Sequence, residues 1–252
     1  MNQRTNTKQS GFTLIELMLS MTFVAVLLVT IALTIIQMAN VYNRGMTLKE
    51  VNQSARDVAD DLRRTAASSQ VFAVNADGSD STDSFAVRTG STVVGGRLCT
   101  GTYSYLWNLA KATEAPVNAN ATQTLNTAGI VQGPITFVKI PDNGKKYCQK
   151  ASGVVVNKHI TAADAKIMTD LLDAGDHKLG IQEFTITTSD SSFDALTKQR
   201  IYSVSYTIGS GATSAMNATQ SGCLAPGTPN ANIAYCNVQK FTIVLRVGNT
   251  VN

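Results

Sequence analysis

Glu16 is the one formally charged residue between Phe12 and Ala39, in a run composed largely of Leu, Ile, Val, Met, Ala and Phe. A carboxylate at the centre of a membrane helix costs about 2.5 to 3.5 kcal/mol, and less near an end, where it reaches the interface. The chemistry open to such a group is ion pairing, because a nearby cation offsets the loss of hydration. The run contains no cation, so we expect the partner of Glu16 to come from outside its own helix.

The apolar run around Glu16 is long enough to cross a bilayer. Its 28 residues give a helix of roughly 40 Å, against a hydrocarbon core of roughly 30 Å. A secretory signal peptide has a shorter apolar core, followed by its cleavage site, whereas here Gly11 precedes the run. Arg4 and Lys8 lie before it, so the positive-inside rule places the leader in the cytoplasm and the C-terminus outside.

The segment from Gly11 to Leu17, Gly-Phe-Thr-Leu-Ile-Glu-Leu, resembles the processing site of type IV prepilins and of the pseudopilins of type II secretion. The resemblance is close from Gly11 to Leu19 and only general over the rest of the helix. It implies that prepilin peptidase cuts after Gly11, that the new N-terminal Phe12 is N-methylated, and that Glu16 links to the N-terminus of a neighbouring subunit. A plain signal anchor explains neither Glu16 nor the position of Gly11.

Four cysteines fall in the part expected outside the membrane, where disulfides persist: Cys99, Cys148, Cys223 and Cys236. A zinc site is not indicated, because there is no Cys-x-x-Cys pair and the two histidines, His159 and His177, are isolated. We expect two disulfides. Three pairings are possible, and we favour Cys99 with Cys148 and Cys223 with Cys236, the second closing a loop that contains two prolines.

Two acidic clusters are candidates for metal binding. One is a polar loop over residues 75–84, with Asp77, Asp80 and Asp83 at a spacing of three. It lacks the order of ligands of an EF-hand, and we expect an exposed acidic loop. The other is Asp170, Asp173, Asp176 and His177, which we interpret as an exposed helix end. The sequence therefore predicts no metal and no cofactor.

The helix continues beyond the membrane run as an amphipathic segment. Apolar residues recur every three or four positions: Val41, Leu48, Val51, Ala55, Val58, Leu62 and Ala66. One helix from about Phe12 to Ser68 is expected, with its second half packed on a globular domain. The predicted organisation is a leader over 1–11, a transmembrane and assembly helix over 12–39, its amphipathic continuation over 40–70, and an extracytoplasmic globular domain over 71–252.

Strand patterns fill most of the globular domain. Short runs are predicted at 85–88, 91–94, 102–108, 135–140 and 153–156, and a helix at 161–174 with Thr161 as its N-cap. Three later segments alternate polar and apolar residues, around Phe184, Tyr206 and Ile243. We expect them to form an antiparallel sheet with its apolar face on the helix. The predicted fold class is α+β.

The net charge and the motifs of the chain favour a structural protein that acts by associating with other proteins. Removing residues 1–11 leaves 19 Lys plus Arg against 17 Asp plus Glu, and this net charge of about +2 does not argue for nucleic acid. No convergent set of catalytic residues is present, so we expect no enzyme, and a membrane-tethered enzyme is the least favoured hypothesis.

The resemblance implies a filament subunit whose partners are prepilin peptidase, other pilin or pseudopilin subunits and the inner membrane. Major pilins usually have a proline within the membrane helix, and this chain has none before Pro116. We therefore favour a minor pilin, with a minor pseudopilin of type II secretion as the alternative. The protein would lie in the cell membrane and then in an extracellular pilus or a periplasmic pseudopilus. The outer loops are open to a surface or DNA ligand.

Overall fold

The structure is a computed structural model that describes residues 13–110, 122–125, 131–151, 154–155, 160–172, 178–211, 214–217, 222–225, 227–229 and 231–248. It divides into two compact units, of which the first ends at Asn43 and the second begins at Arg44.

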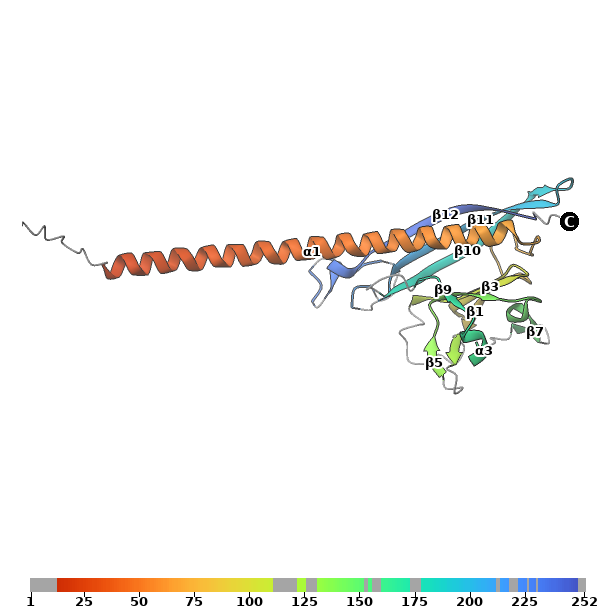
Figure 1. Ribbon diagram of the computed structural model, residues 1–252, viewed down its shortest axis with the longest axis horizontal. Helices are drawn as coiled ribbons and strands as arrows, with labels where there is room; N and C mark the ends of the chain where they lie inside the picture. The colour runs from red at the N-terminus through yellow and green to blue at the C-terminus, as the bar shows by residue number, and fades with distance from the viewer. Residues whose placement is uncertain are drawn as a thin grey trace, which may run out of the picture. The chain divides into compact units, whose positions relative to one another are not determined.

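Helix α1 runs without interruption from Leu14 to Ala67 (Figure 1), close to the predicted bounds. Its buried residues all belong to the second unit: Thr47, Val51, Ser54, Ala55, Val58, Ala59, Leu62, Thr65 and Ala66. The predicted apolar stripe is therefore correct from Val51 onward. It is wrong for Val41 and Leu48, which are 73% and 38% exposed. Val41 precedes Thr47, where the buried face of the helix begins, and Leu48 lies within the first turn of that face.

Three long antiparallel strands form the sheet that packs on α1. They are β10 (Leu179–Asp194), β11 (Gln199–Ser210) and β12 (Val238–Val247), in the order β10-β11-β12. Tyr202, Val204, Tyr206 and Ile208 share one buried face of β11, as predicted. That face contacts the helix, and the hydroxyl of Tyr206 donates to the carbonyl of Ala55 at 2.7 Å. The predicted α+β architecture is confirmed.

A second, five-stranded antiparallel sheet has the order β1-β2-β3-β6-β9. Its strands are β1 (Ser84–Thr89), β2 (Thr92–Cys99), β3 (Tyr103–Asn108), β6 (Phe137–Pro141) and β9 (Thr169–Asp170). The smaller elements are β4 (Gln123–Leu125), β5 (Val131–Pro134), β7 (Lys150–Ala151), β8 (Val154–Val155), η1 (Lys146–Cys148) and η2 (Ile233–Tyr235). The strand predicted at 91–94 extends five residues further, to Cys99.

The helix predicted at 161–174 is wrong over most of its length. Of the described residues 161–172, only α3, Ala162–Ala165, is α-helical. Its predicted cap is present, since the Thr161 hydroxyl and the Asp164 carboxylate form a capping box. Beyond it, β9 pairs with β6, and the amide of Leu171 donates to the carbonyl of Phe137 at 2.9 Å. Pairing with a strand distant in the sequence therefore overrides the local helical period.

Candidate functional site

The Glu16 carboxylate accepts hydrogen bonds from Thr13, the residue directly before α1. One of its oxygens, Oε2, accepts from the backbone amide of Thr13 at 3.0 Å and from the Thr13 hydroxyl at 2.9 Å, while the Glu16 amide donates back to that hydroxyl at 3.3 Å. This is the reciprocal arrangement of a capping box. Thr13-x-x-Glu16 is a local signal that the sequence analysis overlooked. These partners are neutral and leave the charge of Glu16 uncompensated, so the expected ion pair with a neighbouring subunit stays a prediction.

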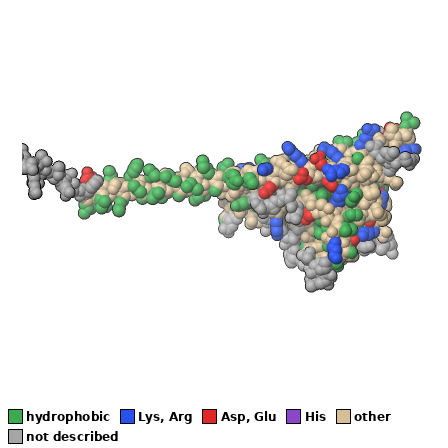
Figure 2. All heavy atoms as spheres, in the orientation of Figure 1, with side chains coloured by type: hydrophobic (Ala, Val, Ile, Leu, Met, Phe, Trp, Pro, Cys, Tyr) green, Lys and Arg blue, Asp and Glu red, His purple; other side chains and the backbone are tan. Residues whose placement is uncertain are grey.

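The first part of α1 presents apolar side chains to its surroundings in every direction. Large hydrophobic residues from Leu14 to Met38 are between 43% and 77% exposed, and Figure 2 shows them along this part of the helix. This is the one described helix long and apolar enough to cross a membrane. A signal sequence also satisfies that test, so length and composition here are compatible with a single-pass membrane protein.

Hydroxyl groups within this apolar surface are already satisfied. Ser20, Thr22, Thr30 and Thr34 each donate to the carbonyl three residues earlier, at 2.7 to 2.9 Å. A hydroxyl without a partner in hydrocarbon would cost several kcal/mol. Because these bonds lie within the helix, the surface can face either lipid or another helix without leaving a donor unpaired.

The two residues of the expected processing site, Gly11 and Phe12, lie outside the described residues. The same holds for His159, His177, Asp173 and Asp176. Asp170 is described, and its carboxylate accepts from the Leu172 amide at 3.0 Å and from the Thr136 hydroxyl at 3.3 Å. Within the described part of the chain, no group of three or more His, Cys, Asp or Glu side chains is placed to hold a metal ion.

The cysteines form the two pairs that we favoured. Cys99 is joined to Cys148, with the two Cα atoms 6.2 Å apart. Cys223 is joined to Cys236, with the two Cα atoms 5.7 Å apart. Cys99 and Cys148 are both buried in the core between the five-stranded sheet and η1. The first bridge therefore fixes η1 to the end of β2, and the second closes the loop that precedes β12.

The acidic loop does not form one site, because each carboxylate has its own partners. Asp77 accepts from the amide of Ser79 at 2.9 Å, and Asp80 pairs with Arg88 and accepts from the amide of Ala86. Both carboxylates are on exposed residues, as predicted, but Asp83 is only 4% exposed. The prediction of an exposed loop is therefore wrong at Asp83.

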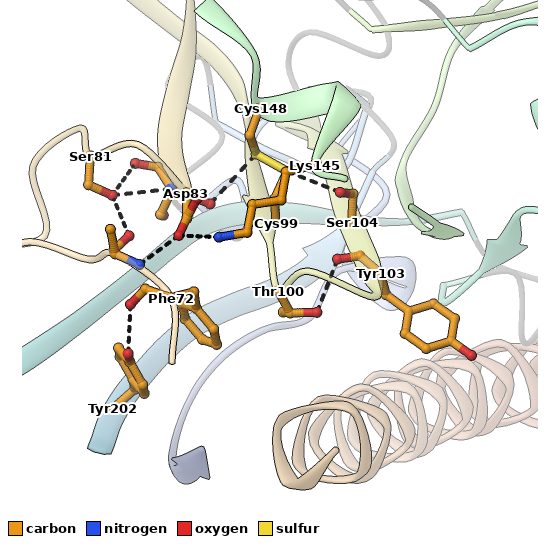
Figure 3. Close-up of polar contacts among 12 residues, drawn as sticks. Phe72, Ser81, Asp83, Cys99, Thr100, Tyr103, Ser104, Lys145, Cys148 and Tyr202 are labelled. Carbon is orange, nitrogen blue, oxygen red and sulfur yellow. Dashed lines mark hydrogen bonds and ion pairs between the residues drawn. A yellow bond between two sulfur atoms is a disulfide. The ribbon is translucent and has the colours of Figure 1, made fainter. Parts of the chain in front are cut away.

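Asp83 is a buried carboxylate that connects three distant segments. It accepts from the amide of Ala73 at 2.7 Å and from Lys145 Nζ at 2.6 Å (Figure 3). Its carbonyl accepts from the amide of Cys99 at 2.8 Å. The contact holds the 75–84 loop beside the Cys99–Cys148 bridge. Its partners are 10 and 62 residues away in the sequence, so spacing gave no signal for it.

A second polar cluster joins α1 to the five-stranded sheet. Lys139 Nζ lies 2.8 Å from the Asp61 carboxylate and 2.7 Å from the Thr65 hydroxyl. The Tyr105 hydroxyl donates to the same carboxylate at 2.8 Å, and burial is the largest cause that raises the pKa of Tyr105 above its usual range. The phenol therefore stays neutral and retains the proton that it donates in the hydrogen bond to Asp61. The cluster orients the helix on the sheet.

Comparison with known proteins adds no further constraint: no protein-family model, no curated protein and no solved structure matches the chain.

Proposed function

We propose that this protein is a structural subunit of a type IV pilus-like filament, inserted in the inner membrane, cleaved after Gly11 by prepilin peptidase, and assembled through the first part of α1. The observation that carries the proposal is the helical surface over 14–38, which is apolar on all sides and exposed, with Glu16 as its one charge. Such a surface needs lipid or other helices around it.

The same surface is suited to both environments of a filament subunit. Lipid and the side chains of neighbouring helices are equally apolar, and transfer between them leaves the internally bonded hydroxyls of Ser20 and Thr34 unchanged. Glu16 is the exception, because its Thr13 partners are uncharged. The N-terminal amine of an adjacent subunit, freed by cleavage after Gly11, would supply the missing cation.

The globular domain supports a role outside the cytoplasm. Two disulfides form and persist in an oxidising compartment, and the described residues hold no metal cluster. A helix without proline along its apolar part favours a minor subunit. Its chemistry is then association and display, with no reaction to catalyse.

The first test is maturation. Intact-mass measurement of the chain from cells that carry prepilin peptidase should show loss of residues 1–11 and one added methyl group. Gly11→Leu should leave the precursor uncut. Gly45→Ala is the matched control, because a methyl group there meets no atom within 4 Å, and it should be cleaved normally. An uncut parent chain in such cells would overturn the proposal.

The second test is location after assembly. Filaments sheared from whole cells should contain the cleaved chain, and its amount there should fall when the peptidase is absent. Recovery of the cleaved chain only from periplasmic pseudopili would replace the pilus with the secretion apparatus. Absence from any filament would remove the structural role.

A further inference from the structure

A cleft of about 640 Å³ lies within the globular domain, between edge strands of its two larger sheets. One wall is β1 with the turn at residues 78–80, and the other is β10 over residues 182–186. Val93, Trp107 and Leu109 line the space between them. A volume of this size is typical of small-molecule and peptide sites. The proposed filament role makes no use of this cleft.

The β1 wall is closed to further strand pairing. The amide of Ser84 donates to the Ser81 hydroxyl at 3.1 Å, the carbonyl of Ser84 accepts from the Ser81 amide at 2.7 Å, and the amide of Ala86 donates to the Asp80 carboxylate at 2.8 Å. Side chains and a turn thus occupy the outward groups of this edge, as sheet proteins commonly arrange.

In the part of the chain that the structure describes, outward backbone groups on the β10 wall are free, as the hydrogen-bond pattern of β10, β11 and β12 indicates. In antiparallel sheets, successive residues of a strand direct their N–H and C=O alternately to the two neighbouring strands. The amide of Ser210 donates to Asn237 beside β12, and β11 pairs with β12 without a register shift. By alternation, Thr207 and Ser205 bond to β10.

The partners of Thr207 and Ser205 on β10 are Glu183 and Thr185. Phe184 and Ile186, which alternate with them, therefore direct their N–H and C=O away from β11, into the cleft. Among the described residues, no hydrogen bond reaches the outward backbone groups of Phe184 or Ile186.

Both ends of this open edge are bounded. At one end, Ile181 forms an isolated parallel bridge with Leu109. At the other, the turn at Gly78 lies over the strand, since a Cβ on Gly78 would be 2.9 Å from Cγ2 of Thr185 and 3.6 Å from the Ile186 carbonyl oxygen. The free groups are then the N–H and C=O of Phe184 and the N–H of Ile186. This is enough for one short added strand.

The geometry points to a peptide-binding site, in which a short extended segment of a partner protein adds a strand to β10 beside Phe184 and Ile186. Main-chain hydrogen bonds would supply the affinity, and alternate apolar side chains of the guest would face Val93 and Leu109. The charges at the rim do not select the guest strongly, because Asp80 pairs with Arg88 and Glu183 with Lys240.

Sugar binding, the other use of a cleft with a tryptophan, is not favoured. A sugar needs an open aromatic face to stack on, but Trp107 is only 5% exposed. One side of its ring packs on Phe184 with the ring centroids 4.4 Å apart, and a Cβ on Gly96 would lie 2.3 Å from the ring. The tryptophan is thus a wall of the cleft, while the backbone edge is the part left unoccupied.

Hydrogen–deuterium exchange of the full chain in detergent micelles tests the site directly. The amides of Phe184 and Ile186 should exchange at least tenfold faster than that of Val204, which lies in the central strand and bonds to β12. A saturating strand-forming probe, acetyl-Lys-Thr-Val-Thr-Val-Thr-Lys-amide, should slow both amides at least tenfold. The same peptide with N-methyl groups on alternate amides keeps its side chains but loses its donors, and it should slow neither.

Two variants locate the effect. Val93→Trp should fill the cleft and abolish the slowing, since Val93 is 41% exposed at its wall. Leu196 is exposed and does not line the cleft. Leu196→Ser should therefore leave the slowing of exchange by the peptide unchanged. Amides already protected without peptide, equal slowing by the N-methylated peptide, no slowing by the probe, or slowing that survives Val93→Trp would each overturn the site.

Discussion

At the scale of single residues, Glu16 combines two roles that a change to leucine alone cannot separate. It caps the helix through Thr13, and it carries a negative charge into an apolar surface. Glutamine retains the capping bonds and removes the charge, whereas leucine removes both. The structure therefore supplies a matched pair of variants that the sequence pattern alone did not suggest.

We predict that Glu16→Gln and Glu16→Leu both insert in the membrane and are cleaved, yet enter filaments poorly, because the amine of the neighbouring subunit loses its ion pair. The measurement is the ratio of this subunit in sheared filaments to that in membranes. If only Glu16→Leu is defective, the capping bonds matter and the charge does not. Thr13→Val, which removes the side-chain bond but keeps the charge, serves as the converse control.

The ionisation of Asp164 should make the stability of the fold depend on pH in the acidic range. Burial raises its pKa, but bonds from Lys146 Nζ at 2.8 Å and from the Thr161 hydroxyl and amide outweigh this effect, and the pKa lies well below its usual range. A carboxyl whose pKa is lower in the folded than in the unfolded state stabilises the fold above the unfolded pKa of about 3.9, and this contribution is lost as pH falls toward the folded pKa.

We expect Asp164→Asn to lower the unfolding temperature most at about pH 6, and the difference from the parent to shrink between about pH 4 and pH 2. Thermal unfolding followed by circular dichroism across this range measures it. Asp60→Asn removes an ion pair whose side chains are 55% and 66% exposed, so it should have little effect at either pH. A difference for Asp164→Asn that grows in acid would contradict the assignment.

At the scale of elements, α1 packs on the sheet by one face that begins at Thr47. Leu62 is 2% exposed and Leu48 is 38% exposed, although both belong to the same sequence stripe. Leu62→Ala should lower the free energy of unfolding by about 2 to 5 kcal/mol, and Leu48→Ala by less than about 1 kcal/mol. Denaturant unfolding gives both values, and equal effects would mean that the packed face is misplaced.

The disulfides stabilise to different extents because they close loops of different length. The residues joined are 49 apart for Cys99–Cys148 and 13 apart for Cys223–Cys236, which gives about 4 and about 3 kcal/mol in the chain-entropy model. Replacing each pair by Ala should lower the free energy of unfolding in that order. The opposite order in denaturant unfolding would show that the entropic account does not apply to this fold.

At the scale of the whole molecule, the unit that begins at Arg44 has a core of its own. Every buried residue of α1 among those described lies from Thr47 onward, and this unit contains both of the larger sheets. A chain starting at Arg44 should therefore be soluble without detergent and unfold cooperatively, within a few degrees of the full chain. Size-exclusion chromatography and calorimetry would measure this.

A chain starting at Ala59 is the matched control for that truncation. It loses Val51, Ala55 and Val58, which are at most 1% exposed, and so it should fail to fold. If this shorter chain folds as well as the longer one, the helix is dispensable for the core and the α+β architecture does not depend on it.

The sequence by itself determined the long helix and the three alternating strands β10, β11 and β12. These depend on composition and on periods of 3.6 or two residues, which are visible within a few turns or a single strand. The sequence left three cysteine pairings possible, and the structure contains the pairing that we favoured. The capping box of Thr13 and Glu16 was also visible at this range, and it was missed. The processing site at Gly11 and Phe12 remains a prediction.

Only the tertiary structure decided which surfaces meet. The segment after α3 pairs with β6 and leaves the helical conformation, Asp83 is buried against Lys145, and Leu48 stays exposed beside a buried Val51. The open edge at Phe184 likewise depends on which strand lies next to β10 and on the turn at residue 78. Each of these depends on residues tens of positions apart, and the free energy of such contacts is not encoded in any local period.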